Sequence, residues 1–261
     1  MEEQPIRLGK SGPEIAGPLG MGLWSWGDSY TWGHGGYDAT LTAASMQEAY
    51  QAALHGGCNL FDTAESYGAP FHWGASERFL ADCMRAEGSQ AAGNGLKPVV
   101  VSKYIPLPWR LFEPRCMLAA LRSSVDRLGV EAVDCYLVHS PVATFRSIQT
   151  LASSLAAAVD SGLAKSVGVS NYSEAEVRET HRVLAERGIP LAVNQAHGGK
   201  TPAQVALNWL ICKGAVPIPG AKSQAQAESN VGALGWRLSE GDVSELDELA
   251  IEGSLKFGQH G

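Results

Sequence analysis

The chain has 261 residues, a length that fits one α/β barrel or one large doubly wound domain. Its formal net charge is −7, which argues against nucleic acid as a partner because nucleic-acid-binding proteins present a basic surface. No run of about 18 apolar residues is present, as a transmembrane helix would require. The first residues do not resemble a signal or transit peptide, so we expect a cytoplasmic or plastid protein that does not bind membranes.

Apolar runs alternate with helix-like segments along the chain, which is typical of a parallel α/β fold. Seven of these runs predict strands: residues 18–24, 59–62, 98–103, 132–139, 166–170, 190–194 and 215–218.

Helix signals lie between the predicted strands. Residues 43–54 predict a helix that stops at Gly56–Gly57. Capping boxes predict three further helix starts, at Ser173 with Glu176, at Thr201 with Gln204, and at Ser223 with Gln226. We find no internal repeat and no linker, and therefore expect a single domain over residues 1–261.

The cysteines and histidines do not suggest a metal site. The five cysteines, at positions 58, 83, 116, 135 and 212, form no C-x-x-C pair and stand mostly among apolar residues. We expect buried free thiols in a reducing compartment. The histidines at positions 34, 72 and 197 lack the spacing of zinc ligands.

Polar residues follow three consecutive predicted strands, where a parallel barrel carries its active site. Asp62 ends the second predicted strand and Tyr67 follows in the loop, while Lys103 and His139 end the third and fourth. Each of them alone has an ordinary structural explanation, such as a helix cap or a solvated strand end. Together they predict acid–base chemistry: a nearby ammonium lowers the pKa of a phenol, a carboxylate holds the ammonium, and an imidazole orients a carbonyl. Such a group needs a separate hydride donor.

Three segments resemble, in the family's order, the motifs of the aldo-keto reductases: residues 59–68 with Ser76–Glu77, residues 168–172, and residues 217–223. The resemblance runs from about Ile6 to Glu252. Residues 24–27, 209–214 and 234–236 are most similar to plant and algal members that are pyridoxal reductase-like. The resemblance implies a TIM-type (β/α)8 barrel of the NADP-dependent oxidoreductase kind.

The resemblance also implies roles for individual residues. Tyr67 would be the general acid, Lys103 would lower its pKa, Asp62 would pair with Lys103, and His139 would orient the substrate carbonyl. The nicotinamide carboxamide would be held by Ser170, Asn171 and Gln195, and Trp24 would line the nicotinamide and substrate pocket.

Lys222 and Ser223 have an independent physical interpretation. They follow a turn at Gly220 and open a helix, and a helix N-terminus beside a lysine attracts anions. We expect the 2′-phosphate of NADPH here, with Gln226 and Asn230 near the adenine. A capped surface helix with a solvated lysine is the alternative.

The sequence departs from the family after Gln195. The string that follows resembles the segment before the helix that precedes the eighth strand, so a sixth helix and a seventh strand, roughly 30 residues or more, are missing. In the family, that strand carries an aromatic residue that stacks on the nicotinamide and a Ser-Pro-Leu segment near the pyrophosphate. The barrel would be left open, or the two flanking strands would pair directly and close a smaller barrel.

The sequence therefore leaves three hypotheses. The first is NADPH-dependent reduction of a small aldehyde or ketone, with pyridoxal as one candidate. The second is a catalytically impaired module on the same scaffold that binds a nucleotide or a partner. The third is a Schiff-base lyase that uses Lys103 and binds a phosphorylated sugar at Lys222. The sequence carries no signature of the oligomeric state.

Overall fold

The computed structural model describes residues 5–8, 12–27, 41–88, 95–141, 146–195 and 204–234, together with Arg237 and Val243. A short antiparallel hairpin of β1 (Ile6–Arg7) and β2 (Glu14–Ile15) precedes a parallel sheet. The six strands of this sheet stand side by side in chain order: β3 (Gly20–Gly22), β4 (Leu60–Asp62), β5 (Val99–Tyr104), β6 (Cys135–Val138), β7 (Val167–Ser170) and β8 (Leu191–Gln195).

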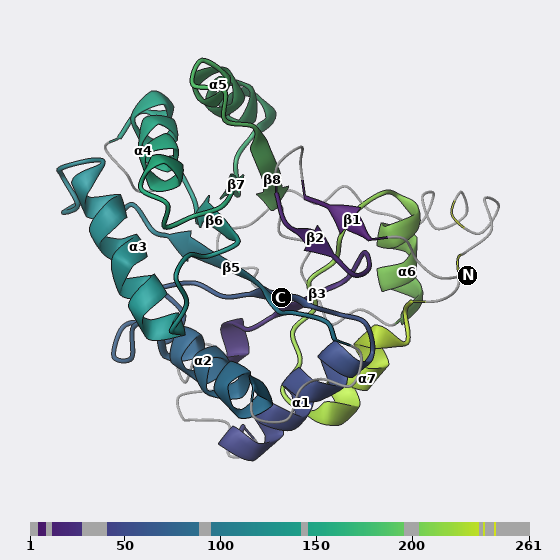
Figure 1. Ribbon diagram of the computed structural model, residues 1–261. Coiled ribbons are helices and arrows are strands. Elements are labelled where there is room, and N and C mark those ends of the chain that lie inside the picture. Colours follow the sequence, from purple (N-terminus) through teal and green to yellow (C-terminus); the bar gives the residue numbers. More distant parts are fainter. Residues whose placement is uncertain are drawn as a thin grey trace.

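The helices follow the strands in alternation, as the sequence predicts. They are α1 (Ala43–His55), α2 (Ala75–Gly88), α3 (Arg115–Leu128), α4 (Ile148–Asp160), α5 (Glu174–Ala185), α6 (Gln204–Cys212) and α7 (Gln224–Val231), and a 3₁₀ turn, η1 (Trp24–Trp26), follows β3. Figure 1 shows α1 to α5 in an arc along the outer side of the curved sheet. None of the helices in the described part of the chain is long and apolar enough to cross a membrane.

Of the predicted capping boxes, the one at Ser173 is complete, whereas the one at Ser223 forms only in part, because Gln226 Oε1 accepts from the Lys222 backbone. Ser173 and Glu176 form the capping box of α5, and the Ser223 side chain accepts a hydrogen bond from the Gln226 backbone at the start of α7. The structure begins α6 at Gln204, so the capping box predicted at Thr201 lies outside the described residues.

Alternating side chains divide the core into two layers. On the outer face of the sheet, Phe61, Val100 and Tyr136 pack against the helices. On the inner face, Leu60, Val101 and Leu137 pack with residues of the hairpin. Because the hairpin covers the starts of the strands, the opposite end, where the strands finish, stays available for a site.

The last predicted strand only partly forms. Gly20 and Gly22 of β3 donate backbone hydrogen bonds to Pro217 and Pro219, at 2.8 and 3.0 Å. A side chain on Gly22 could not fit, because its Cβ would lie 2.8 Å from the Ile218 carbonyl oxygen. The C-terminal segment therefore joins the free edge of β3, which is the place of an eighth strand in a closed barrel.

The sheet stays open on its other side. Among the described residues, β8 pairs with β7 alone, and the 217–220 segment pairs with β3 alone. Side chains of β8 are half-buried or exposed, whereas those of β5, β6 and β7 are all buried. Within the part of the chain that the structure describes, the predicted gap is thus present as an incomplete barrel, and the two flanking segments do not pair to close a smaller one.

Candidate active site

A buried lysine connects the ends of β4 and β5. The Lys103 ammonium donates hydrogen bonds to Asp62 Oδ2 at 2.6 Å, to the Thr63 carbonyl at 2.9 Å and to the Tyr67 hydroxyl at 3.0 Å. The Lys103 side chain is only 1% exposed and that of Asp62 only 5%. Asp62 pairs in register with Val101, so Lys103, two residues further on, reaches the carboxyl end of β4. The structure thus brings together the three residues that the sequence places at this end.

The local fold of the loop after β4 places Tyr67 over this lysine. The Tyr67 backbone N–H donates to the Ala64 carbonyl, which tightens the loop, and Gly68 takes the left-handed conformation at φ 102°. The Tyr67 ring stacks on Trp24 with centroids 6.0 Å apart, and its face lies 4.8 Å from the Lys103 ammonium. Trp24 therefore lies beside Tyr67, and its place in the wall of a nicotinamide pocket stays a prediction.

Burial and the neighbouring charges act in opposite directions on the pKa values of Tyr67 and Lys103. Burial raises the pKa of the Tyr67 phenol; the Lys103 charge pulls that pKa down, but the net direction is upward. Burial alone would lower the pKa of Lys103, but Asp62 and Tyr67 outweigh it and raise that pKa. Lys103 thus acts on the phenol in the predicted direction, and the pKa of Tyr67 lies above its ordinary value only because burial is the larger effect. At neutral pH the site holds a protonated phenol and an ammonium.

This charge state bears on the lyase hypothesis. A lysine must be an unprotonated amine to attack a carbonyl. Lys103 is instead protonated and engages three acceptors, among them the Asp62 carboxylate. The structure therefore argues against a Schiff base at Lys103.

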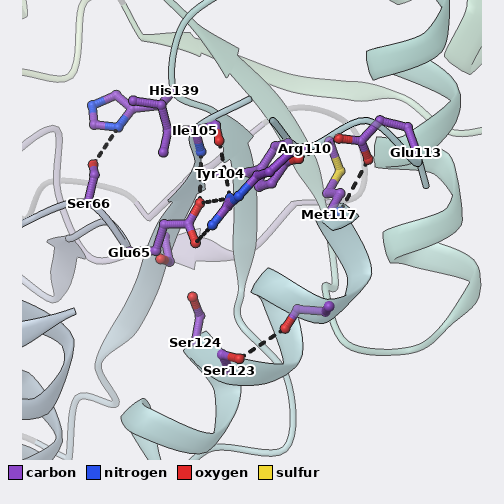
Figure 2. Close-up of polar contacts among 12 residues, drawn as sticks. Glu65, Ser66, Tyr104, Ile105, Arg110, Glu113, Met117, Ser123, Ser124 and His139 are labelled. Atoms are coloured by element: carbon purple, nitrogen blue, oxygen red, sulfur yellow. Dashed lines mark hydrogen bonds and ion pairs between the residues drawn. The ribbon is translucent and has the colours of Figure 1, made fainter. Parts of the chain in front are cut away.

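His139 completes the group from the next strand. It follows β6 directly, its backbone N–H donates to the Tyr104 carbonyl at 2.8 Å, and its side chain is half-buried. The imidazole meets the Tyr67 ring edge-on with centroids 5.6 Å apart. Its Nδ1 lies 3.1 Å from Ser66 Oγ, a contact visible in Figure 2. The four predicted residues thus gather at one end of the sheet.

Three predicted amide and hydroxyl groups gather beside His139. Asn171 adopts a left-handed backbone at φ 60°, and its side-chain amide donates to the His139 carbonyl at 2.9 Å and to Ser170 Oγ at 3.1 Å. Gln195 pairs in register with Ser170, and its carbonyl accepts the Asn171 backbone N–H. Ser170, Asn171 and Gln195 therefore form one polar group at the ends of β7 and β8.

The predicted anion-binding segment is fixed by side chains around it. Trp26 Nε1 donates to the Ala221 carbonyl at 2.8 Å, and Asn230 donates to the Gly220 carbonyl at 3.2 Å. The Lys222 backbone N–H donates to Gln226 Oε1 at 2.7 Å. Gln226 and Asn230, which the sequence places near an adenine, thus hold the backbone of this segment. These hydrogen bonds fix the backbone of residues 220–223 at the N-terminus of α7, where the partial positive charge of the helix favours an anion.

Sequence reasoning missed an ion pair beneath the site. Glu65 is buried, and its carboxylate accepts two hydrogen bonds from the Arg110 guanidinium and one from the Ile105 backbone at 2.9 Å. Figure 2 shows this clamp, which joins the loop after β4 to the loop after β5. Glu65 lies in the same motif as Asp62 and Tyr67, but no local signal identifies an arginine 45 residues away as its partner.

The comparisons with known proteins agree with this fold. The model of the aldo/keto reductase family matches residues 18–198 and 195–251. Pyridoxal reductase, chloroplastic, from Arabidopsis thaliana is 30% identical and aligns with 95% of this chain and 87% of its own length. Probable aldo-keto reductase 1 from Glycine max is 23% identical over 98% of this chain and 92% of its own. The chain belongs to the aldo/keto reductase family, and is thus an oxidoreductase.

Solved structures of reductases share the fold. A Bombyx mori aldo-keto reductase in complex with NADP superposes with a TM-score of 0.73 at 17% identity, covering 95% of this chain and 93% of that one. A Brucella melitensis aldo/keto reductase superposes with a TM-score of 0.68 at 20% identity, covering 95% of this chain and 100% of that one.

The comparisons also show that this chain is shorter than the length over which it aligns with a relative. The two pieces of the family match meet at residues 195–198, where the sequence predicts the missing block. The alignment with the Arabidopsis relative spans 323 positions, which exceeds the 261 residues of the chain by 62, so at least that many positions have no residue here. This agrees with the open edge of β8.

Proposed function

We propose that the chain reduces the carbonyl group of a small aldehyde or ketone with NADPH, and that pyridoxal is the first substrate to test. The observation that carries this proposal is the buried contact of the Lys103 ammonium with both Asp62 and Tyr67. The naming of the Arabidopsis relative as a pyridoxal reductase supports the choice of substrate.

The residues around the site fit a nicotinamide nucleotide. Ser25, next to Trp24, has a buried hydroxyl with no hydrogen-bond partner in the described structure, which suits a ligand contact. Ser170, Asn171 and Gln195 offer the donors and acceptors that a carboxamide needs. In this proposal Lys222 and Ser223 hold the 2′-phosphate. When bound, NADPH supplies the hydride.

The chain's own residues would supply the proton. Because Lys103 donates to the Tyr67 oxygen, the phenol proton is left to point at a substrate oxygen. The raised pKa of Tyr67 keeps that proton on the phenol until negative charge develops on the carbonyl oxygen. His139 would donate a second hydrogen bond to the same oxygen and so fix the carbonyl against the phenol.

A single substitution tests this proposal. Tyr67→Phe removes the proton donor, and we expect turnover of NADPH with pyridoxal to fall by about 10²-fold or more while NADPH affinity stays nearly constant. Tyr50→Phe is the matched control, because the Tyr50 hydroxyl is buried in the outer core without a hydrogen-bond partner in the described structure. Wild-type turnover in Tyr67→Phe would refute the role of Tyr67.

The open barrel supports one other function. A strand-helix block is missing beside the nucleotide site, so the chain could bind a nucleotide without turning over a substrate. Tight NADPH binding with no oxidation of NADPH against a panel of aldehydes would favour this reading over the first. Steady turnover of any member of the panel would exclude it.

A further inference from the structure

The hydroxyl of Ser66 lies within hydrogen-bond distance of the His139 imidazole. Ser66 Oγ lies 3.1 Å from Nδ1 of His139, and Figure 2 shows the two side chains pointing toward each other across the loops after β4 and β6. Ser66 directly precedes Tyr67, so one loop contributes both the proposed acid and a partner of the proposed carbonyl-orienting group.

The chemistry of a neutral imidazole makes this contact consequential. The ring carries a single N–H, and the hydrogen bond at one nitrogen decides which nitrogen bears it. To hold a carbonyl oxygen, the nitrogen that faces the substrate must be the donor. Its other nitrogen then offers a lone pair, which only a donor can satisfy, and a serine hydroxyl is such a donor.

We propose that Ser66 is a positioning residue for the reaction proposed above: its hydroxyl donates to Nδ1 of His139, holds the ring plane, and keeps the N–H on Nε2. This inference rests on the proposed function only for its effect on turnover. The tautomer of His139 is a property of the protein alone.

The surrounding contacts fix the position of Ser66. Glu65, on one side, is held by Arg110 and by the Ile105 backbone. Tyr67, on the other side, is held by Lys103, and the Ser66 carbonyl accepts the Ala69 backbone N–H at 2.9 Å. Both neighbours are anchored in buried contacts, so the hydroxyl between them has little freedom to leave the imidazole.

Kinetics give the first test. In Ser66→Ala we expect kcat for carbonyl reduction to fall about tenfold, as the loss of one ordinary hydrogen bond predicts, with the Kd of NADPH within about twofold of wild type. Ser66→Thr keeps a hydroxyl and should restore most of kcat. Ser123→Ala is the control, because that exposed hydroxyl donates to the Ala119 carbonyl within α3. An unchanged kcat in Ser66→Ala would overturn the proposal.

A spectroscopic test needs no turnover. Ring ¹⁵N spectra at a pH where His139 is neutral report which nitrogen bears the proton, and His139→Gln identifies its signals among the seven histidines. We expect the N–H on Nε2 in wild type and a shift toward a mixture of both tautomers in Ser66→Ala. A wild-type N–H on Nδ1, or identical spectra in the two proteins, would overturn the proposal. If the spectra are as expected but the protein shows no turnover, the result would count against the proposed reductase function and not against the role of Ser66.

Discussion

Asp62→Asn tests the buried charge balance on which the site depends. The substitution keeps the shape of the side chain but leaves the Lys103 ammonium, 1% exposed, without its counter-charge at 2.6 Å. Removing one partner of a buried pair costs roughly 3–5 kcal/mol, a large part of the roughly 5–15 kcal/mol that stabilises a typical domain. We therefore expect the free energy of unfolding to fall by about 3–5 kcal/mol, measured by urea unfolding at pH 7 with tryptophan fluorescence.

Two variants accompany that measurement. Glu174→Gln breaks the pair with Arg178, in which both side chains are 77% exposed, and we expect a change below about 0.5 kcal/mol. Combining Asp62→Asn with Lys103→Met removes both buried charges and should recover at least half of the loss. If Asp62→Asn unfolds with the same free energy as Glu174→Gln, the reasoning about the buried pair is wrong.

The pH dependence of the same effect has a definite sign. The pKa of Lys103 lies above its ordinary value of 10.5 in the folded protein, because Asp62 and Tyr67 outweigh the effect of burial. The stabilisation is therefore complete at neutral pH and is lost only as the pH rises beyond about 10.5. In Asp62→Asn the counter-charge is gone and burial lowers the pKa of Lys103, so the difference between wild type and the variant should be largest near pH 6 and shrink as the pH rises toward about 10.

The pKa of Tyr67 lies above its ordinary value of 10.0, so the phenol keeps its proton and kcat/KM for reduction should not fall through deprotonation of Tyr67 below about pH 10. A fall in kcat/KM centred near pH 8 that depends on Tyr67 would contradict this expectation. Trp26→Phe removes the donor to the Ala221 carbonyl, so the Kd of NADPH, measured by fluorescence titration, should rise about 3- to 10-fold while that of NADH stays within about twofold. Gly168→Ala would place a Cβ 2.5 Å from the Val193 carbonyl oxygen and should lower the unfolding free energy by about 1–3 kcal/mol, whereas Gly88→Ala, with open space around it, should not.

The repeating part of the fold could be predicted because it follows from local patterns. Buried parallel strands appear in the sequence as short apolar runs, and six of the seven predicted runs became strands of the sheet. The N-terminal hairpin was missed because each of its strands has only two residues, which is too short for a period to appear. The seventh run, at 215–218, forms no strand; the overlapping segment 217–220 pairs with β3 through two backbone hydrogen bonds and one bridge.

Only the part of the site that lies at the ends of strands could be predicted from the sequence. Asp62, Lys103 and His139 end neighbouring strands, so topology alone brings them together. The direction of the Tyr67 pKa was not predictable, because it depends on burial and charge acting in opposite senses, and burial is not readable from the loop sequence. The contact of Ser66 with His139 is likewise set by loop geometry between residues 73 positions apart.

The central claim is that the shortened barrel still binds the cofactor at the site of Tyr67 and Lys103. The most direct measurement is a titration of the purified chain with NADPH, followed by tryptophan fluorescence, because Trp24 stacks on Tyr67 in this site. We predict saturable binding in the micromolar range or tighter. The absence of binding by a folded sample would mean that the missing block removed the cofactor site, and would contradict the proposed reductase function.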